Sequence, residues 1–344
     1  MTDEIFEKLS IEIIIINDQD AFAFHSFTLE FYIKSNPQDL SEIPTLILVV
    51  GPTAVGKTNL CLKLAKFFNT EIISCDSRQF YKEMNLGTAK PTPDELAQVK
   101  HHLIDSLSIE DVYDVKKFEQ DAMNILTQLF KEKKVVIMTG GSGLFADAIT
   151  EGLDEMPEVE SEIRTQIIQE YEERGIEFLQ EEVKKADPEY FETVDRQNPQ
   201  RLMRALEIWR GTGKKFSSFR VKQKVERPFQ TIKIGLNRDR EELYQRIDQR
   251  MEEMIWAGLF QEAESLFKKR HLNALQTVGY QEIFSYMEGE YDREEAIRLL
   301  KRNSRRYAKR QLTWFRRDLA IHWFHPDQES EIIQWVQTRL AENH

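Results

Sequence analysis

The chain has 344 residues, 41% of them hydrophobic, and a formal net charge of −12, so it is long enough for two domains with cores of their own. It has no apolar run of membrane-spanning length. Its net negative charge argues against a protein that coats nucleic acid, although a local basic patch could still act because salt screens charges more than about 8 Å away. Cys61 and Cys75 lack the spacing of a zinc site or a disulfide framework, which fits a reducing cytoplasm.

Residues 1–43 form a separate N-terminal segment. Ile11–Ile16 and Phe22–Ile33 are apolar enough for strands, but polar and turn-forming residues interrupt them. The segment has neither the basic leading end nor the small-residue cleavage site of a signal peptide. We therefore expect an extension of unknown role, consistent with a misassigned start, and assign no chemistry to it.

A phosphate-binding loop is the strongest motif in the chain. Leu46–Val50 reads as a buried parallel strand, and a helical pattern follows the loop directly. Between them the sequence matches G-x-x-x-x-G-K-[ST], and its eight residues are Gly51, Pro52, Thr53, Ala54, Val55, Gly56, Lys57 and Thr58. Backbone N–H groups, the helix N-terminus and the Lys57 ammonium favour an anion, and Thr58 offers a hydroxyl to a magnesium ion. The sequence therefore predicts a phosphate or diphosphate site.

A second short strand, Glu71–Cys75, leads into Asp76. A carboxylate at the C-terminal end of a parallel strand lies where ligands bind in open α/β sheets, so Asp76 is a candidate general base or metal ligand. An equally weighted alternative is a helix N-cap, for which aspartate is well suited. The pair His101 and His102 has no third ligand at metal-site spacing, which disfavours a metal site there.

The third strand argues against nucleotide hydrolysis. Val115–Phe130 reads as an amphipathic helix and Val135–Met138 as a buried strand that runs into a glycine-rich loop, Thr139–Gly143. Hydrolases with a phosphate loop usually place an acidic residue at the end of such a strand to organise magnesium and water. The absence of one here disfavours an ATPase motor or a GTPase.

From residue 151 to about 225 the composition becomes acidic and helical, which predicts an insertion. Arg201 and Arg204 share a helix face there, and intrahelical ion pairs are the simpler interpretation from composition alone. Ile232–Leu236 then returns to strand character, and Arg238–Gly258 predicts a helix. On that helix Arg246 and Arg250 are positioned either to reach a diphosphate or to form surface ion pairs with Glu242 or Glu253, which leaves both interpretations open.

The segment Lys301–Arg317 carries eight basic residues and no acidic one, in a protein that is acidic overall. On a helix, Arg302, Arg306 and Arg310 would align, as would Arg305 and Lys309. Aromatic residues lie between them. This composition favours nucleic-acid contact over a merely solvated face.

Taken in order, several stretches closely resemble the bacterial tRNA dimethylallyltransferase (tRNA isopentenyltransferase) family. They are GPTAVGKT, DSRQFYKEMNLGTAKPT, HHLID, TGGSGLF, NPQRLMRALEI, RIDQRMEEMI, TVGYQEI and KRNSRRYAKRQLTWFR. The resemblance covers residues 45 to about 325. It implies transfer of a dimethylallyl group from dimethylallyl diphosphate to N6 of the adenine 3′ of the anticodon in tRNA.

The resemblance also implies roles for individual residues. Asp76 would receive the N6 proton, Thr58 would hold Mg²⁺ and the diphosphate, and Arg250 would contact the leaving diphosphate. The stretch Lys301–Gln311 would line the tRNA. The residues expected at tRNA are Asp76, Ser77, Arg78, Gln79, Ser142, Arg164, Gln200, Arg201, Leu202, Met203, Arg204, Gln276, Thr277, Val278, Gly279, Tyr280, Gln281, Lys301, Arg302, Arg305, Arg306, Lys309 and Arg310. Ser142 and Gln276 stand where relatives commonly have Thr and Arg, which weakens those two assignments.

We therefore predict an α/β fold: a phosphate-loop, parallel-sheet core like that of nucleotide kinases, with a helical insertion. Residues 44–150 and 226–325 would form the core, residues 151–225 the tRNA-binding insertion and residues 326–344 a tail. The expected cofactor is Mg²⁺, and the expected partners are the tRNA anticodon stem-loop and dimethylallyl diphosphate, with no membrane and no obligate protein partner. The alternatives are an adenylate isopentenyltransferase and a small-molecule kinase that would bind ATP, and the basic C-terminal helix disfavours the former.

Overall fold

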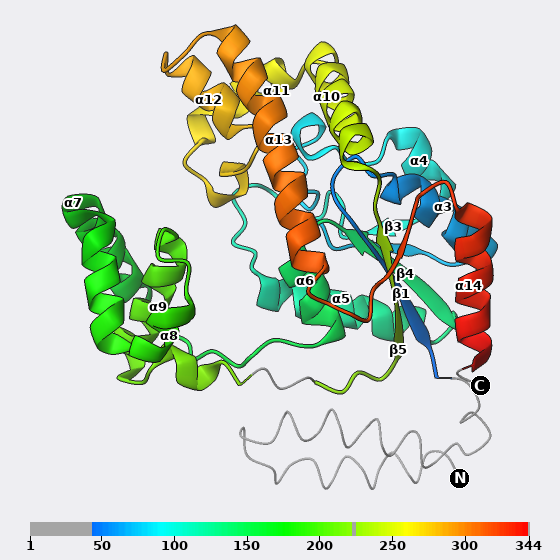
Figure 1. Cartoon of the computed structure of the whole chain (residues 1–344), viewed down its shortest axis with the longest axis horizontal. Coiled ribbons are helices and arrows are strands. Elements are labelled where there is room, and N and C mark those ends of the chain that lie inside the picture. Colours follow the sequence, from blue (N-terminus) through cyan, green and yellow to red (C-terminus); the bar gives the residue numbers. More distant parts are fainter. Residues whose placement is uncertain (1–42, 222–224, 343–344) are drawn as a thin grey trace, which may run out of the picture. The chain divides into compact units, whose positions relative to one another are not determined.

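The computed structural model describes residues 43–221 and 225–342 (Figure 1). The strands expected within residues 1–42 lie outside this part of the chain. The chain divides into two compact units, of which the second comprises residues 114–119 and 147–226. Across the described ranges, no helix is long and apolar enough to span a membrane.

The first unit is built on a six-stranded sheet, and every pairing in it is parallel. The strand order is β3-β2-β4-β1-β5-β6. The strands are β1 (Thr45–Val50), β2 (Ile72–Ser74), β3 (His101–His102), β4 (Val135–Gly140), β5 (Gln230–Leu236) and β6 (His322–Phe324). The predicted α/β fold with a parallel sheet is confirmed.

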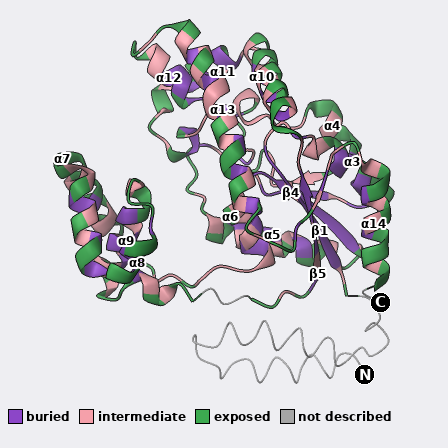
Figure 2. Ribbon diagram, in the orientation of Figure 1, coloured by how far each residue is buried: buried purple, intermediate pink, exposed green. Residues whose placement is uncertain are grey.

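The central strand β1 is buried on both faces, as its continuous apolar run predicts (Figure 2). Ile47 and Val49 face one side and pack in a cluster with Ile137 of β4 and Ile234 of β5. Leu46 and Leu48 alternate with them and are also buried. Burial on both faces fixes the strand, and therefore the point where the glycine loop leaves it.

The helices expected after the glycine loop, over Arg238–Gly258 and in the basic segment are all present in this unit, with somewhat different bounds. The helix expected over Arg238–Gly258 is α10 (Arg240–Trp256), and the basic segment belongs to α13 (Arg293–Phe315), which begins earlier because Asp292 caps it through Glu295 N. The others are α3 (Lys57–Phe67), α4 (Pro93–Gln98), α11 (Leu259–Leu266), α12 (Gln281–Met287) and α14 (Glu329–Glu342). Short 3₁₀ turns occupy Leu86–Thr88, Phe267–Lys269 and Asn273–Leu275.

Helix α14 corrects the prediction of a tail at residues 326–344. Ile332 and Val336 of this helix are fully buried in the same cluster as Ile47 and Leu64. The sequence signal was present, since these two apolar residues lie four apart on one helix face. Helix α14 therefore packs against the core of the first unit through Ile332 and Val336.

A second apolar cluster in the first unit joins α10, α11, α12 and α13. It includes Met251, Leu259, Ile283 and Leu300, together with Met84 from the loop after β2. This cluster holds α10 and α13 beside one another, and the two helices touch directly. It consequently positions the arginines of α10 and the inward face of α13.

The second unit is helical. Its elements are α7 (Ser161–Ala186), α8 (Pro188–Thr193), α9 (Pro199–Thr212) and a 3₁₀ turn at Phe216–Phe219. Asn198 caps α9 through Arg201 N, Pro199 follows in the first turn, and Gly213 ends the helix at φ 70°. Helices α5 (Val115–Leu129) and α6 (Gly143–Thr150) each contain residues of both units.

Candidate functional site

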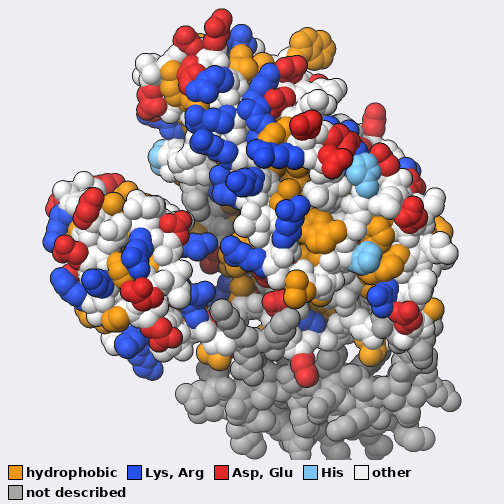
Figure 3. Space-filling view, viewed as in Figure 1, with side chains coloured by type: hydrophobic (Ala, Val, Ile, Leu, Met, Phe, Trp, Pro, Cys, Tyr) orange, Lys and Arg blue, Asp and Glu red, His pale blue; other side chains and the backbone are white. Residues whose placement is uncertain are grey.

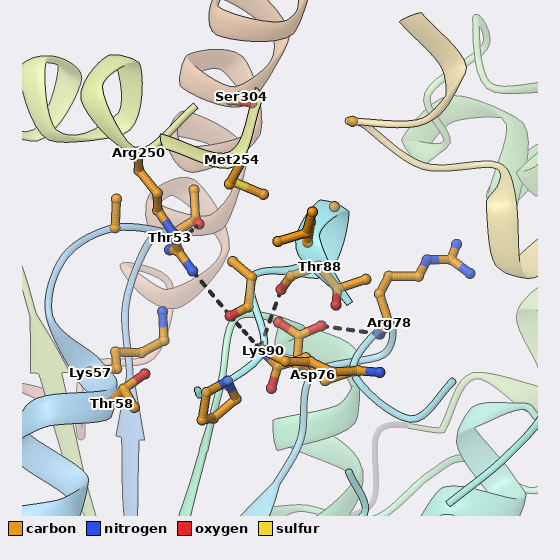
Figure 4. A pocket seen from close by; sticks show the side chains of 18 of the residues that line it. Thr53, Lys57, Thr58, Asp76, Arg78, Thr88, Lys90, Arg250, Met254 and Ser304 are labelled. Carbon is orange, nitrogen blue, oxygen red and sulfur yellow. Dashed lines mark hydrogen bonds between the residues drawn. The ribbon is translucent and has the colours of Figure 1, made fainter. Parts of the chain in front are cut away.

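A cavity of about 660 Å³ lies in the first unit, where the chain leaves the C-terminal ends of β1, β2 and β4. The glycine loop, Asp76 and Arg250 all line it, and Figure 4 shows Lys57, Asp76 and Arg250 pointing into it from separate elements. Strand order explains this meeting, because β1, β2 and β4 are neighbours and end at the same edge of the sheet. The predicted diphosphate site and the predicted base therefore share one cavity.

Lys57 closes the glycine loop on itself. Its Nζ donates hydrogen bonds to the carbonyl oxygens of Gly51 and Pro52, each at 2.9 Å. Burial lowers the pKa of Lys57 to about 8, and nearby Asp76 opposes this shift. The ammonium is therefore desolvated and lies beside the cavity, where a bound anion would favour its protonated form.

Two arginines hold the outer side of the same loop. Arg238 Nε donates to the carbonyl oxygen of Val55 at 3.0 Å, and Arg246 Nε donates to that of Ala54 at 3.0 Å. In a trans peptide the N–H points opposite to the C=O, so fixing these carbonyls turns the Gly56 N–H away from Arg238. The loop is thus held in one conformation by side chains from outside it. Arg246 also lines the cavity, so its Nε bonds the loop beside the predicted diphosphate site.

Arg250 reaches into the cavity from α10. One guanidinium nitrogen lies 3.3 Å from Thr53 Oγ1, and the other donates to the carbonyl oxygen of Ala89 at 3.1 Å. These contacts support the orientation predicted for Arg250 rather than a surface ion pair with Glu253. A guanidinium held between the loop and the opposite wall is well placed for a phosphate group.

Asp76 follows β2 and is only partly exposed. Its Oδ1 accepts the backbone N–H of Arg78 at 3.0 Å, and residues 77–80 form a turn, so Asp76 does not cap a helix. Burial raises the pKa of Asp76, while the Arg78 N–H and the charge of Lys57 act in the opposite direction. Its second oxygen, Oδ2, remains to accept a proton from a ligand in the cavity.

The residues that follow Asp76 are fixed by hydrogen bonds to other loops of the site. Ser142 Oγ accepts the backbone N–H of Ser77 at 3.0 Å and donates to Ser77 Oγ at 3.0 Å. Gln79 Nε2 donates to the carbonyls of Thr88 and Ala89, each at 3.3 Å. Ser77, Gln79 and Ser142 thus brace the turn around Asp76, and Arg78 and Gln79 line the cavity.

The wall opposite the glycine loop is a turn at residues 85–89. The carboxylate of Glu262, on α11, accepts the backbone N–H groups of Asn85, Leu86 and Gly87 at 3.1, 2.9 and 3.0 Å. The Tyr280 hydroxyl donates to the same carboxylate at 2.6 Å. A Cβ at Gly87 would lie 2.4 Å from the Tyr280 ring, so this close contact requires glycine.

The predicted stretch 276–281 divides into two groups. Thr277, Val278 and Gly279 line the cavity, and Gln276 and Gln281 are exposed. Tyr280 is fully buried, so its side chain supports the cavity wall and the prediction of tRNA contact by that side chain is wrong. The apolar neighbours in the α11–α12 cluster explain its burial.

The basic residues of α13 also divide into two groups. Arg305 makes a two-oxygen ion pair with Asp248, and Lys301 pairs with Glu252 at 2.5 Å, both partners lying on α10. The exposed basic residues form a band over this helix in Figure 3. They are Arg306, Lys309 and Arg310 on α13, and Arg316 and Arg317 directly after its end. Arg302 is only partly exposed.

In the helical unit, two of the predicted residues, Arg164 and Arg204, meet at the carboxylate of Glu207, and a third, Gln200, accepts from Arg164. Arg164 lies 3.3 Å from Glu207 and donates to Gln200 at 2.5 Å, and Arg204 donates to Glu207 at 2.8 Å. The Arg204 pair spans three residues of α9, which is the intrahelical pair considered from the sequence. Arg201 is exposed at the start of the same helix.

The predicted contacts of the Leu202 and Met203 side chains with tRNA are wrong. Leu202 and Met203 are 0% and 2% exposed and pack in the core of the helical unit. They lie on the inward side of a helix whose exposed side carries Arg201, so they support that helix.

Gln311 and Glu262 have places in the site that the sequence did not predict. Gln311 lies inside the basic segment, where it was expected at tRNA, but its side chain is 5% exposed and bonds the glycine loop. Periodicity offered one signal, because Gln311 shares a helix face with the buried Ser304, Ala308 and Phe315. Glu262 gave no comparable signal, because its partners are distant backbone groups.

The protein side chains of the cavity suit a magnesium ion that is bound mainly by the phosphates of a substrate. Within the described residues, no group of three or more His, Cys, Asp or Glu side chains is placed to hold a metal ion. His102 instead pairs with Glu71, and His101 with the Val99 carbonyl. Mg²⁺ commonly binds through phosphates, waters and one or two protein oxygens, and the Thr58 hydroxyl in the first turn of α3 lines the cavity.

Comparison with known proteins gives consistent matches. The profile of the IPP transferase family matches residues 79–318. A tRNA dimethylallyltransferase of Bacteroides thetaiotaomicron is 51% identical over 295 residues, covering 86% of this chain and 96% of the relative. One from Cytophaga hutchinsonii is 52% identical over 297 residues, covering 86% and 98%.

Solved structures agree with the sequence matches. A full-length tRNA isopentenylpyrophosphate transferase from Bacillus halodurans superposes with a TM-score of 0.66 at 35% identity, covering 87% of this chain and 97% of its own. A eukaryotic dimethylallyltransferase acting on tRNA gives a TM-score of 0.65 at 27% identity, covering 79% and 69%. These neighbours share the parallel α/β fold described above.

Proposed function

Because the chain belongs to the IPP transferase family, we propose that it transfers a dimethylallyl group from dimethylallyl diphosphate to N6 of the adenine 3′ of the anticodon in tRNA. The observation that carries the proposal is one cavity that holds an anion-binding loop, Arg250 and the carboxylate of Asp76. The loop suits a diphosphate, and Asp76 suits a proton acceptor. Relatives about half identical to this chain bear the name of that activity.

The proposed step forms a bond between adenine N6 and C1 of the allylic group while the bond from C1 to the diphosphate oxygen breaks. The exocyclic amine is a weak nucleophile because its lone pair is delocalised into the ring, so its proton must be accepted as the new bond forms. Asp76 accepts that proton, and the products are N6-isopentenyladenosine and diphosphate. Burial raises the pKa of Asp76 toward the pH of the cell, which makes the carboxylate a stronger base.

Charge accumulates on the departing diphosphate, and the site offers groups for it. Lys57, Arg250 and the free N–H groups at the start of α3 would neutralise that charge in a partly desolvated cavity. The Thr58 hydroxyl would hold Mg²⁺ together with diphosphate oxygens, and the ion would supply further positive charge there. A target adenine would have to leave the anticodon stack to reach Asp76.

The exposed basic residues of α13 and the arginines of the helical unit are the proposed tRNA contacts. Arg306, Lys309 and Arg310 are exposed on a helix whose inward face lines the cavity. This arrangement supports a substrate larger than a free nucleotide, because a nucleotide alone has no use for a basic surface outside the cavity. With tRNA as substrate, the reaction would take place in the cytoplasm.

The test incubates the protein with unmodified tRNA, Mg²⁺ and labelled dimethylallyl diphosphate, and then analyses the tRNA nucleosides. Labelled isopentenyladenosine is the expected product. Parallel reactions replace the tRNA with AMP or the prenyl donor with labelled ATP. Prenylated AMP without prenylated tRNA would favour an adenylate isopentenyltransferase, and phosphate transfer without prenyl transfer would favour a kinase.

A further inference from the structure

Gln311 joins two loops of the site through one side chain. Its Oε1 accepts the backbone N–H of Thr53 at 2.9 Å, and its Nε2 donates to the carbonyl oxygen of Gly141 at 2.9 Å. Thr53 belongs to the glycine loop after β1, and Gly141 to the loop after β4. Both ends of a buried carboxamide are therefore used, by two segments that lie far apart in the sequence.

The bonding pattern is specific to glutamine at this position. The two backbone groups require one acceptor and one donor on the same short head group, which a carboxamide provides and a carboxylate or an ammonium does not. The approach is also close, since a Cβ at Gly141 would lie 2.1 Å from Gln311 Nε2. Glycine at position 141 thus leaves the space that the amide occupies.

One of the two loops would bind the leaving diphosphate, and the other supports the proposed base, Asp76. The Thr53 hydroxyl contacts Arg250, and the rest of its loop forms the proposed diphosphate cradle. On the other side, Gly141 precedes Ser142, which bonds the residue after Asp76, and an added Cβ at Gly141 would be 3.8 Å from Asp76 Oδ2. Gln311 lies between the cradle and the base.

We propose that Gln311 is a positioning residue that fixes the diphosphate loop relative to Asp76, and with it the distance between the leaving group and the proton acceptor. The inference rests on the function proposed above. It replaces the expectation that this residue lines the tRNA. Because Gln311 occupies the Thr53 N–H, the diphosphate would be bound by the other donors of the loop.

The test compares Gln311→Met, which loses both bonds, with Gln311→Glu, which keeps an acceptor for Thr53 N–H but faces the Gly141 carbonyl with an oxygen. The control is Thr313→Ala, at a more exposed position on the same helix. Circular dichroism first establishes that each variant is folded. Titration calorimetry with inorganic pyrophosphate and Mg²⁺ then measures the affinity of the diphosphate loop alone. Steady-state kinetics with tRNA and dimethylallyl diphosphate measure kcat and KM.

Gln311→Met should bind pyrophosphate roughly three- to tenfold more weakly, as expected for a hydrogen bond lost from the loop. Its kcat should fall roughly 10- to 100-fold, because small misplacement of reacting groups is costly. The KM for tRNA should stay within about twofold of the wild-type value. Gln311→Glu should lose at least as much kcat, since its oxygen repels the Gly141 carbonyl.

A second route reaches the same bond without changing Gln311. Gly141→Ala should displace the amide and reproduce the loss of kcat. A raised KM for tRNA with unchanged kcat and pyrophosphate affinity would overturn the inference and return Gln311 to the tRNA surface. Wild-type protein that binds no pyrophosphate would overturn the proposed function and this inference with it, whereas wild-type binding that all the variants match would overturn the inference alone.

Discussion

The turn at residues 85–89 depends on one carboxylate, so removal of Glu262 is a direct test of how the cavity wall is held. Its two oxygens accept the N–H groups of Asn85, Leu86 and Gly87 and the hydroxyl of Tyr280. Hydrogen bonds to a charged group contribute about 1.5–3 kcal/mol each when both partners are desolvated. Asn85 is exposed and its N–H can bond water instead, whereas Tyr280 is fully buried.

Counting the buried hydroxyl fully and the partly buried N–H groups at a fraction of that range, Glu262→Ala should lower the free energy of unfolding by about 3–5 kcal/mol. Tyr280→Phe removes one of the four bonds and should cost about 1.5–3 kcal/mol. Glu264→Ala, an exposed position on the same helix, should remain within about 0.5 kcal/mol of wild type.

Urea unfolding monitored by circular dichroism measures these differences, provided that the slope with denaturant stays constant. Amide hydrogen exchange adds a local measurement, because Leu86 and Gly87 should lose protection in Glu262→Ala. The reasoning is wrong if Glu262→Ala is as stable as Glu264→Ala. It is also wrong if those two amides stay protected in a variant that is otherwise folded.

Three further predictions concern the site. Asp76→Ala should lower kcat by about 10²–10⁴ with tRNA binding retained. In the wild type, kcat should fall as the pH drops through a pKa above the ordinary value of aspartate. A kcat that changes neither with pH nor with the substitution would show that Asp76 is not the base. For Lys57, the folded pKa of about 8 lies below the unfolded value of 10.5, so the unfolded state binds more protons between these values and the free energy of unfolding should rise with pH across that window. Pyrophosphate affinity should fall over the same window relative to Lys57→Arg, and calorimetry showing parallel curves would contradict this. Removing Arg306 and Arg310 together should flatten the log–log salt dependence of tRNA binding by about 0.7–0.9 for each phosphate that these arginines neutralise. Arg305→Gln should instead lower stability and leave that slope unchanged. Equal slopes for both variants would refute the division of the basic residues of α13 into exposed and ion-paired groups.

The sequence predicts those features whose cause is local. Leu46–Val50 is continuously apolar because β1 is buried on both faces, and the glycine loop follows from the order of strand, loop and helix. Asp76 could be placed near that loop because parallel strands end at a common edge. The α13 segment was recognised as helical and basic for the same reason, since composition and the i, i+4 spacing lie within the segment itself.

The features that the sequence did not reveal depend on pairs of residues far apart in the chain. Arg305 reads as a free cation until α10 brings Asp248 to it, and a single sequence does not show which acidic residue will be its neighbour. The tail became a core helix because the sheet offers Ile332 and Val336 an apolar face. In each case the local pattern was correct and the partner was unknown.

Gln311 shows why such partners matter for function. The glycine-loop motif specifies that backbone donors converge on an anion, but it does not specify what holds the loop at the correct distance from the base. In this chain that separation depends on groups outside the motif: Arg238 and Arg246 on two loop carbonyls and Gln311 on the Thr53 N–H. A motif of eight residues can bind phosphate on several folds, whereas alkyl transfer requires the phosphate and a proton acceptor to be fixed relative to each other. We therefore expect the proposed reaction to depend on the supports of the loop as much as on the loop, and substitutions at those supports should alter kcat while the motif remains intact.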